Sequence, residues 1–245
     1  MASAVRHQDA MPDRRAIGLN LAGQRLGRKG QETRERVLVA ALRLFDDPHG
    51  PPVTLTSVAR EASMRLSNLY LYFPDMIELL LAVLDRIMAD ADAAFMDHLR
   101  TRWPDDRLGQ SSAEFIRAHF VVWKQHARLL QLRNALSDTE PRIMDYRQSA
   151  TQPILQFLML QMDGCNSDEF TCANLAIVVM TGFERVAAIV TNPNYGAMVR
   201  DHTPHSVDEM TDQLIAAAAR LLELAIRDQR AAANRIPHQA PFERA

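Results

Sequence analysis

Apolar residues recur along most of the chain at intervals of three and four, the spacing of one face of an α-helix. The first regular segment runs from Gln31 to Asp46, and the prolines and glycine that follow cannot continue it. Two short helical segments come next. The first has Thr54 as its N-cap, and the second ends at Pro74 because the residue before a proline is pushed out of the helical region. The residues expected on the buried side of the second segment are Leu66, Leu69, Tyr70 and Phe73.

Beyond Asp75 the helical pattern lengthens, and the alternation typical of strands is almost absent. Helix-capping pairs are expected at Ser111–Glu114, Asn166–Glu169 and Ser206–Glu209. The expected helices cover residues 76–102, 111–126, 128–136, 140–162, 166–191 and 206–230. The sequence therefore predicts an all-α protein of about nine helices, in which a three-helix head precedes a longer helical body.

Composition and targeting signals change this picture little. The 245 residues are 47% hydrophobic and 24% charged, which is ordinary for a globular protein and excludes extensive disorder. No signal peptide is recognised, and the longest uncharged apolar run, 170–183, is shorter than the roughly 20 residues that span a membrane. Cys165 and Cys172 lack the spacing of metal ligands. We therefore expect free thiols, a cytoplasmic protein without membrane association, no bound metal and no cofactor.

Charge is distributed unevenly along the chain, although the net charge is only −2. Residues 1–73 carry 11 basic and 7 acidic side chains, whereas the remainder carries 17 basic and 23 acidic ones. A basic leading segment on an acidic body is typical of a protein whose N-terminal part binds a polyanion. Basic tails that bind nothing have the same composition.

The stretch from Thr54 to Leu80 has the dimensions of a helix-turn-helix, because residues 63–65 separate its two short helices. In such a motif the leading turn of the second helix can enter the major groove of DNA. Its characteristic positions are Thr54, Ser57, Val58, Ala59 and Ala62, then Leu69, Tyr70, Tyr72, Phe73 and Pro74, followed by Leu79 and Leu80. On these residues the stretch resembles the DNA-binding head of the TetR family of bacterial transcription regulators.

The resemblance implies a division of the chain into four parts. Residues 1–30 would form a flexible basic arm, 31–75 a helix-turn-helix DNA-binding domain, 76–230 a ligand-binding and dimerisation domain, and 231–245 a loose tail. Only about fifty residues carry the resemblance closely. The body resembles the family in the number and length of its helices.

Double-stranded operator DNA is the partner that the resemblance implies for the head. Asn can read adenine, Arg can read guanine, and hydroxyl groups suit a base or a phosphate. The two tyrosines have an alternative role in packing the core of the head. Basic residues before the first helix could enter an adjacent minor groove. The DNA-binding residues expected are Arg25, Arg28, Lys29, Thr54, Thr56, Arg65, Ser67, Asn68, Tyr70 and Tyr72.

Four positions depart from the family pattern. Ser63 stands where the turn usually has glycine, so strain in the backbone is expected there. Met76 replaces a lysine that commonly binds a phosphate, and Leu66 and Leu71 stand where polar residues are common. The two leucines could contact thymine methyl groups or could simply be exposed. The departures at Met76, Leu66 and Leu71 motivate an alternative function, an all-α ligand-binding or adaptor protein that has lost specific DNA recognition.

The last two long helices carry small and apolar residues at spacings that suit a close helix–helix seam. A four-helix interface between two subunits would pair the heads, because reading two half-sites about 34 Å apart calls for a two-fold symmetric protein. Packing within one chain is the alternative. The residues expected at the homodimer interface are Ala173, Ile177, Ala188, Met210, Leu214, Ala217 and Leu221.

Aromatic residues with a few polar neighbours are concentrated in the body between residues 95 and 159. Such a combination is usual for a small-molecule site, although most of these residues would also serve as core. The ligand-binding residues expected are Phe95, Trp103, Phe115, His119, Trp123, Arg133, Asn134, Phe157 and Met159.

No catalytic constellation or phosphate-binding glycine loop is recognised, and the histidine spacings do not suit a metal site, so no catalytic residues are expected and an enzyme is disfavoured. The sequence favours a homodimeric, TetR-like repressor that binds palindromic operator DNA. A mainly hydrophobic small-molecule effector would release it by shifting the helix over residues 76–102.

Overall fold

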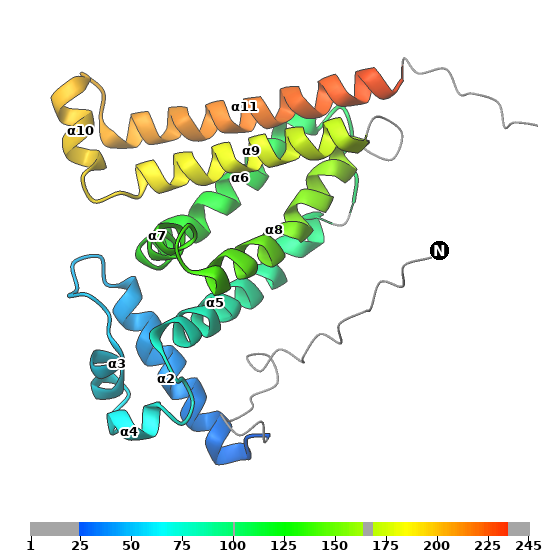
Figure 1. Ribbon diagram of the computed structural model, residues 1–245. Helices are drawn as coiled ribbons and strands as arrows, with labels where there is room; N and C mark the ends of the chain where they lie inside the picture. The colour runs from blue at the N-terminus through cyan, green and yellow to red at the C-terminus, as the bar shows by residue number, and fades with distance from the viewer. Residues whose placement is uncertain (1–24, 100, 164–168, 235–245) are drawn as a thin grey trace, which may run out of the picture. The chain divides into compact units, whose positions relative to one another are not determined.

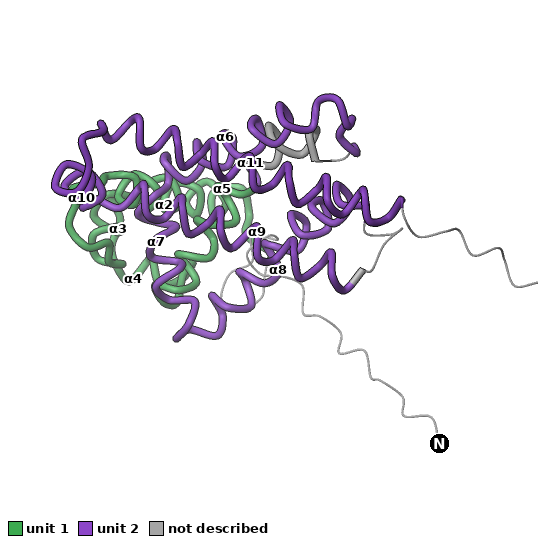
Figure 2. The backbone as a smooth tube through the Cα atoms, turned by 90° about the horizontal axis from the view of Figure 1, so that it is seen from above, with its two compact units in different colours: residues 1–88 green, residues 89–245 purple. Residues whose placement is uncertain are grey.

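The computed structural model describes the backbone of residues 25–99, 101–163 and 169–234, and the side chains of these residues except 90–99 and 169 (Figure 1). The described chain is organised as ten helices, α2 to α11, and has no strand. It divides into two compact units, residues 1–88 and 89–245 (Figure 2). The all-α prediction is confirmed.

Unit 1 is built from three helices and the first part of a fourth: α2 (Arg28–Asp46), α3 (Leu55–Glu61), α4 (Leu66–Leu69) and α5 (Met76–Leu99). Helices as short as α3 and α4 are not stable alone in water and depend on tertiary packing. α2 packs against α3, and α3 against α4. The core residues of the unit, all at most 3% exposed, include Val37, Leu38, Ala41, Phe45, Val58, Ala59, Leu69, Phe73, Leu79 and Leu80.

Unit 2 contains the remaining helices: α6 (Leu108–Gln125), α7 (Ala127–Leu136), α8 (Pro141–Gln161), α9 (Glu169–Val190), α10 (Tyr195–His202) and α11 (Val207–Ala233). α9 and α11 run side by side, and α10 joins them at one end (Figure 1). α11 also packs against α6, and α8 packs against α9. The boundary between the two units falls within α5, later than the division at residues 75 and 76 expected from the sequence.

Several helix ends differ from the sequence prediction. α6 begins at Leu108, so Ser111 lies inside the helix and caps nothing, and Glu114 accepts a hydrogen bond from Gln110 at 2.8 Å. The expected capping box at Ser206 and Glu209 is present at the start of α11. The expected cap Asn166 lies outside the described residues.

Helix α10 was not expected, because the helices predicted from the sequence leave residues 192–205 without one. Asn192, Pro193 and Asn194 do end α9, but a helix of eight residues follows them and includes His202. Its buried residues are Tyr195 and Val199, at 4% and 2% exposure. Two apolar contacts four residues apart hold this short helix in place, and they are too few to give a clear periodic pattern in the sequence.

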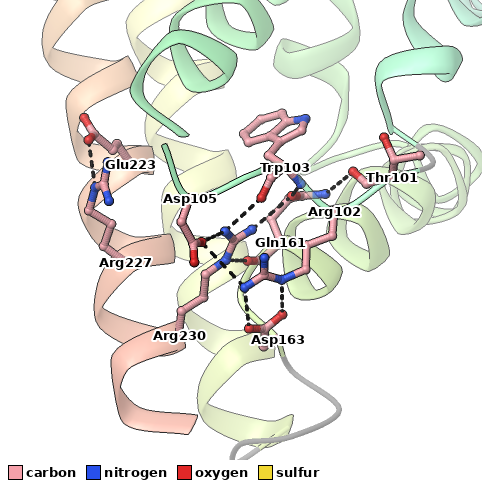
Figure 3. A network of polar contacts seen from close by, with 9 residues as sticks. All are labelled: Thr101, Arg102, Trp103, Asp105, Gln161, Asp163, Glu223, Arg227 and Arg230. Atoms are coloured by element: carbon pink, nitrogen blue, oxygen red, sulfur yellow. Dashed lines mark hydrogen bonds and ion pairs between the residues drawn. The ribbon is translucent and has the colours of Figure 1, made fainter. Parts of the chain in front are cut away.

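Arg230, near the end of α11, joins three segments of unit 2 (Figure 3). Its guanidinium donates to the carbonyl oxygen of Trp103 at 2.9 Å, to the carbonyl oxygen of Gln161 at 2.8 Å, and to the carboxylate of Asp105. The Gln161 side chain accepts from the Trp103 N–H at 2.8 Å and donates to the Thr101 carbonyl at 3.0 Å. Arg230 is only 4% exposed. It therefore fixes the C-terminal ends of α8 and α11 to the connection before α6.

Candidate functional site

Helix α3 begins with a complete capping box in the structure. The Thr54 hydroxyl accepts from the Ser57 N–H at 3.1 Å, and the Ser57 hydroxyl accepts from the Thr54 N–H at 2.9 Å. These two bonds satisfy backbone donors that the first turn of a helix cannot pair internally. Thr54 is therefore confirmed as the N-cap, and both Thr54 and Thr56 remain exposed.

The turn between α3 and α4 is a Schellman motif with Ser63 in the left-handed region. Ser63 has φ of 52°, its N–H donates to the Arg60 carbonyl at 3.1 Å, and the Met64 N–H donates to the Ala59 carbonyl at 2.9 Å. This pair of bonds ends a helix and usually uses glycine at the left-handed position. The strain expected from a serine here is thus present in the backbone.

We expect Ser63→Gly to raise the free energy of unfolding by about 1 kcal/mol, because glycine relieves the left-handed strain and loses part of that gain to its own flexibility when unfolded. Urea denaturation followed by circular dichroism measures it. Ser67→Gly, the same change at an exposed position inside α4, is the control and should lower stability. Equal losses in both variants would contradict strain at Ser63.

Helix α4, with its N-cap Arg65 and the turn that follows it, presents polar side chains to solvent and buries two apolar ones. Leu69 and Phe73 are at most 2% exposed, whereas Arg65, Ser67 and Asn68 are exposed. Tyr70 is 43% exposed, so its expected place on the buried side is wrong. The reason is angular: residues 69 and 73 are four apart and share the buried face, and residue 70 is turned away from it. Tyr72 is half-buried.

Three further candidate residues lie where α2 begins. Arg25, Arg28 and Lys29 are all exposed. The sequence placed them before the first helix, but α2 begins at Arg28, so Arg28 and Lys29 belong to its first turn. A bond from Arg28 to Glu32, at 2.9 Å, supports this extra turn as an i,i+4 pair. Their positions are therefore fixed to a helix; residues 1–24 of the expected arm lie outside the described part.

In unit 2 the structure gathers three of the expected ligand-binding residues into one aromatic cluster. The ring centroids of Trp103 and Phe157 are 5.2 Å apart, those of Phe115 and Phe157 5.3 Å, and those of Trp103 and Phe115 5.9 Å. Phe183, which was not singled out in the sequence, lies 6.5 Å from Phe115. The rings come from α6, α8, α9 and the segment before α6, and their packing supplies a large share of the core.

Three further expected residues, Trp123, Arg133 and Asn134, belong to a polar cluster whose members come from α6, α7, α8 and α9. Glu184 on α9 accepts from Arg133 at 3.1 Å and, with its other oxygen, from Arg147 on α8 at 2.8 Å. Arg133 also donates to Asn134 and lies 5.7 Å from the Trp123 ring centroid. Burial lowers the pKa of the Arg133 guanidinium, and Glu184 opposes that shift. Breaking such a buried pair leaves an uncompensated charge, so these positions tolerate little change.

His119 lies beside this cluster without joining its hydrogen bonds. Its Nε2 is shielded from solvent and has no hydrogen-bond partner among the described residues. Its ring lies 6.4 Å from those of Phe120 and Trp123. Burial lowers the pKa of His119 to about 4, with Glu184 raising it and Arg133 lowering it further. The imidazole is therefore neutral at neutral pH.

Two of the expected ligand-binding residues, Phe95 and Met159, belong to neither cluster. The side chain of Phe95 lies outside the described residues, and Met159 is half-buried on α8. Sequence reasoning missed Glu184 and Arg147, because a charged residue in an apolar helix carries no spacing signal for a partner 51 or 37 residues away. Among the described residues no group of acidic, histidine and cysteine side chains could hold a metal ion.

Helices α9 and α11 each leave apolar side chains exposed. None of the seven residues expected at the homodimer interface is buried: Ile177, Ala217 and Leu221 are exposed, and the others are half-buried. Further exposed apolar residues on the same helices are Phe170, Val178 and Leu224. The alternative, packing within one chain, does not agree with the exposure of Ile177, Ala217 and Leu221, whereas the four half-buried residues are compatible with both arrangements. Gly182 on α9 also borders open space, because a Cβ atom added there would meet no other atom within 4 Å.

Among the residues that the structure describes, one helical segment, Phe170–Val190 of α9, is long and apolar enough by composition to cross a membrane, with a mean hydropathy of 1.6. Its length exceeds that of the uncharged run noticed in the sequence, because the helix continues through Glu184 and Arg185. Glu184 is buried in its pairs with two arginines, and α9 packs against α6, α8 and α11. Composition alone is weak evidence for a membrane span, because core helices of soluble proteins pass the same test.

Comparisons with known proteins extend the sequence resemblance to the whole fold. No protein-family model and no curated protein matches the chain. A TetR-family transcriptional regulator from Streptomyces coelicolor has a TM-score of 0.57 at 18% identity, over 86% of this chain and 93% of that one. A transcriptional regulator from Rhodococcus sp. RHA1 has a TM-score of 0.57 at 14% identity, over 83% and 99%. At these identities the shared property is the fold: the chain has the fold of TetR-family regulators.

Proposed function

We propose that this chain is a homodimeric regulator of transcription, a repressor, that binds palindromic operator DNA through the helix-turn-helix of unit 1. The observation that carries this proposal is the surface of α4. Leu69 and Phe73 anchor the helix, while Arg65, Ser67 and Asn68 stand in solvent with donors and acceptors free to meet base edges and phosphates. The three exposed side chains contribute nothing to the core of unit 1, so their role is sought outside the chain. The TetR-like fold supports the same DNA-binding function.

Dimerisation would use the apolar residues that α9 and α11 leave exposed. Exposed apolar patches of this kind mark interaction sites in soluble proteins. A mainly hydrophobic effector would bind unit 2 near the aromatic and polar clusters. α5 runs from Met76 into unit 2 without interruption, so a change in unit 2 that shifts this helix would alter the spacing of the two heads. The protein would act in the cytoplasm, and no catalytic role is proposed.

Val178→Asp tests the dimer and DNA binding together. Val178 is 66% exposed on α9, so the substitution leaves the monomer core intact but places a charge in the proposed interface. We expect a monomer by light scattering where the wild type is a dimer. Affinity for a palindromic duplex should fall on the order of a hundredfold, because two half-sites are no longer held together.

Met144→Asp is the matched control, since Met144 is 54% exposed on α8, outside the proposed interface. It should remain dimeric and keep its DNA affinity. A Val178→Asp protein that stays dimeric would show that the subunits pair elsewhere.

A further inference from the structure

Two large apolar side chains are exposed among the described residues of unit 1, and they are neighbours: Tyr70 at 43% and Leu71 at 59%. Both follow α4 directly. Hydrogen bonds from the Leu71 N–H to the Asn68 carbonyl (3.3 Å) and from the Phe73 N–H to the Leu69 carbonyl (3.0 Å) continue the helical turn through them. Leu71 comes four residues after Ser67 and three after Asn68, so the three side chains share one exposed face.

The surroundings of Leu71 indicate what would cover it. Its exposed neighbours are one apolar residue, Tyr70, and the polar or basic residues Arg65, Ser67 and Asn68. The exposed apolar area is therefore limited to two adjacent side chains, which is smaller than the broad patch that a protein partner needs. While its side chain is in contact with water, Leu71 contributes no hydrophobic free energy, and it would do so only when a partner covers it. In the major groove the bases present hydrogen-bonding groups and one apolar group, the 5-methyl of thymine. A branched aliphatic side chain beside base-reading polar ones is complementary to that methyl group.

We propose that Leu71 is a specificity-determining residue that packs against the 5-methyl group of a thymine in each operator half-site. This inference rests on the proposed DNA-binding function and adds a base preference to it. Asn68 and Ser67 would supply hydrogen bonds to the neighbouring base pairs. The operator should therefore contain a thymine, at one fixed position of each half-site, that pyrimidines without the methyl group cannot replace.

Deoxyuridine substitution tests the contact, because it removes the methyl group and leaves base pairing unchanged. The probe is a duplex selected by the wild-type protein from a randomised pool, with each thymine replaced in turn at symmetric positions of both half-sites. At one position we expect the wild-type affinity to fall about fourfold per half-site, or about sixteenfold for the symmetric pair. Leu71→Ala should bind thymine and uracil duplexes equally.

Val121→Ala, a change at a residue 63% exposed on α6, is the control and should discriminate like the wild type. Thermal unfolding of Leu71→Ala confirms that the head is intact. If no uracil substitution weakens the wild type, or if Leu71→Ala discriminates as the wild type does, the inference is overturned while DNA binding stands. If no duplex is selected at all, the proposed function fails together with it. Loss of oligomerisation in Leu71→Ala would instead indicate a protein contact and also overturn the inference.

Discussion

Arg230→Ala should lower the free energy of unfolding by about 3–5 kcal/mol, the largest effect that we expect from a single substitution outside the head. The guanidinium satisfies the carbonyl oxygens of Trp103 and Gln161 and the carboxylate of Asp105. It holds the pKa of the Asp105 carboxyl below its usual value by a hydrogen bond. Truncation would leave the two carbonyls unsatisfied at a site from which water is largely excluded (Figure 3).

Arg227→Ala is the control for this prediction, because Arg227 lies on the same helix and forms an ion pair with Glu223 at 2.8 Å, but its side chain is 46% exposed. We expect its loss to cost at most about 1 kcal/mol. Arg230→Lys keeps the charge but lacks the planar guanidinium, so its loss of unfolding free energy should lie between those of Arg230→Ala and Arg227→Ala. This variant keeps the test informative if Arg230→Ala does not fold. Equal midpoints of urea denaturation for Arg230→Ala and Arg227→Ala would contradict the structural role.

Lowering the pH from 6.5 to 4 should destabilise the wild type by about 3 kcal/mol more than it destabilises His119→Phe. Burial lowers the pKa of His119 from 6.5 to about 4 in the folded protein. Between these values the unfolded chain binds a proton that the folded chain does not. The histidine therefore opposes folding as the pH falls through this window, and its contribution becomes constant about one pH unit above 6.5. Phenylalanine cannot titrate and removes an unpaired buried nitrogen.

The measurement is the free energy of unfolding at several pH values between 4 and 7.5. His205→Phe is the control, since His205 is exposed in the connection before α11. The acid destabilisation that we assign to His119 should remain in this variant. Parallel curves for the wild type and His119→Phe would mean that His119 becomes charged without cost, which would contradict its shielded position.

The head could be predicted closely from the sequence because its structure depends on local signals. A threonine before an apolar repeat and the turn after it identify α3, α4 and the cap at Thr54, although α4 ends at Leu69 and not at Pro74 as expected. The face of Tyr70 was assigned incorrectly, because in a helix of one turn the apolar character of tyrosine does not distinguish the core from a recognition surface.

The body could be predicted only as a set of helices. Its defining contacts join residues far apart in the chain: Arg133 and Glu184 are 51 residues apart, and Arg230 and Trp103 are 127 apart. No periodic pattern encodes such pairs, since periodicity reports which face of a helix is buried and not what lies against it. For the same reason, the spacing of the apolar residues on α9 and α11 could not show whether they face the core of the chain or a second subunit.

The proposed DNA binding is tested most directly by a salt titration of the wild-type protein on duplex DNA flanking its own coding region. Each head exposes Arg28, Lys29 and Arg65, so a dimer offers about six cations to phosphates. We expect nanomolar binding to one palindromic sequence, with log K falling against log salt at a slope of about −4 to −6. Weak binding that ignores sequence would contradict the proposal and support the adaptor alternative.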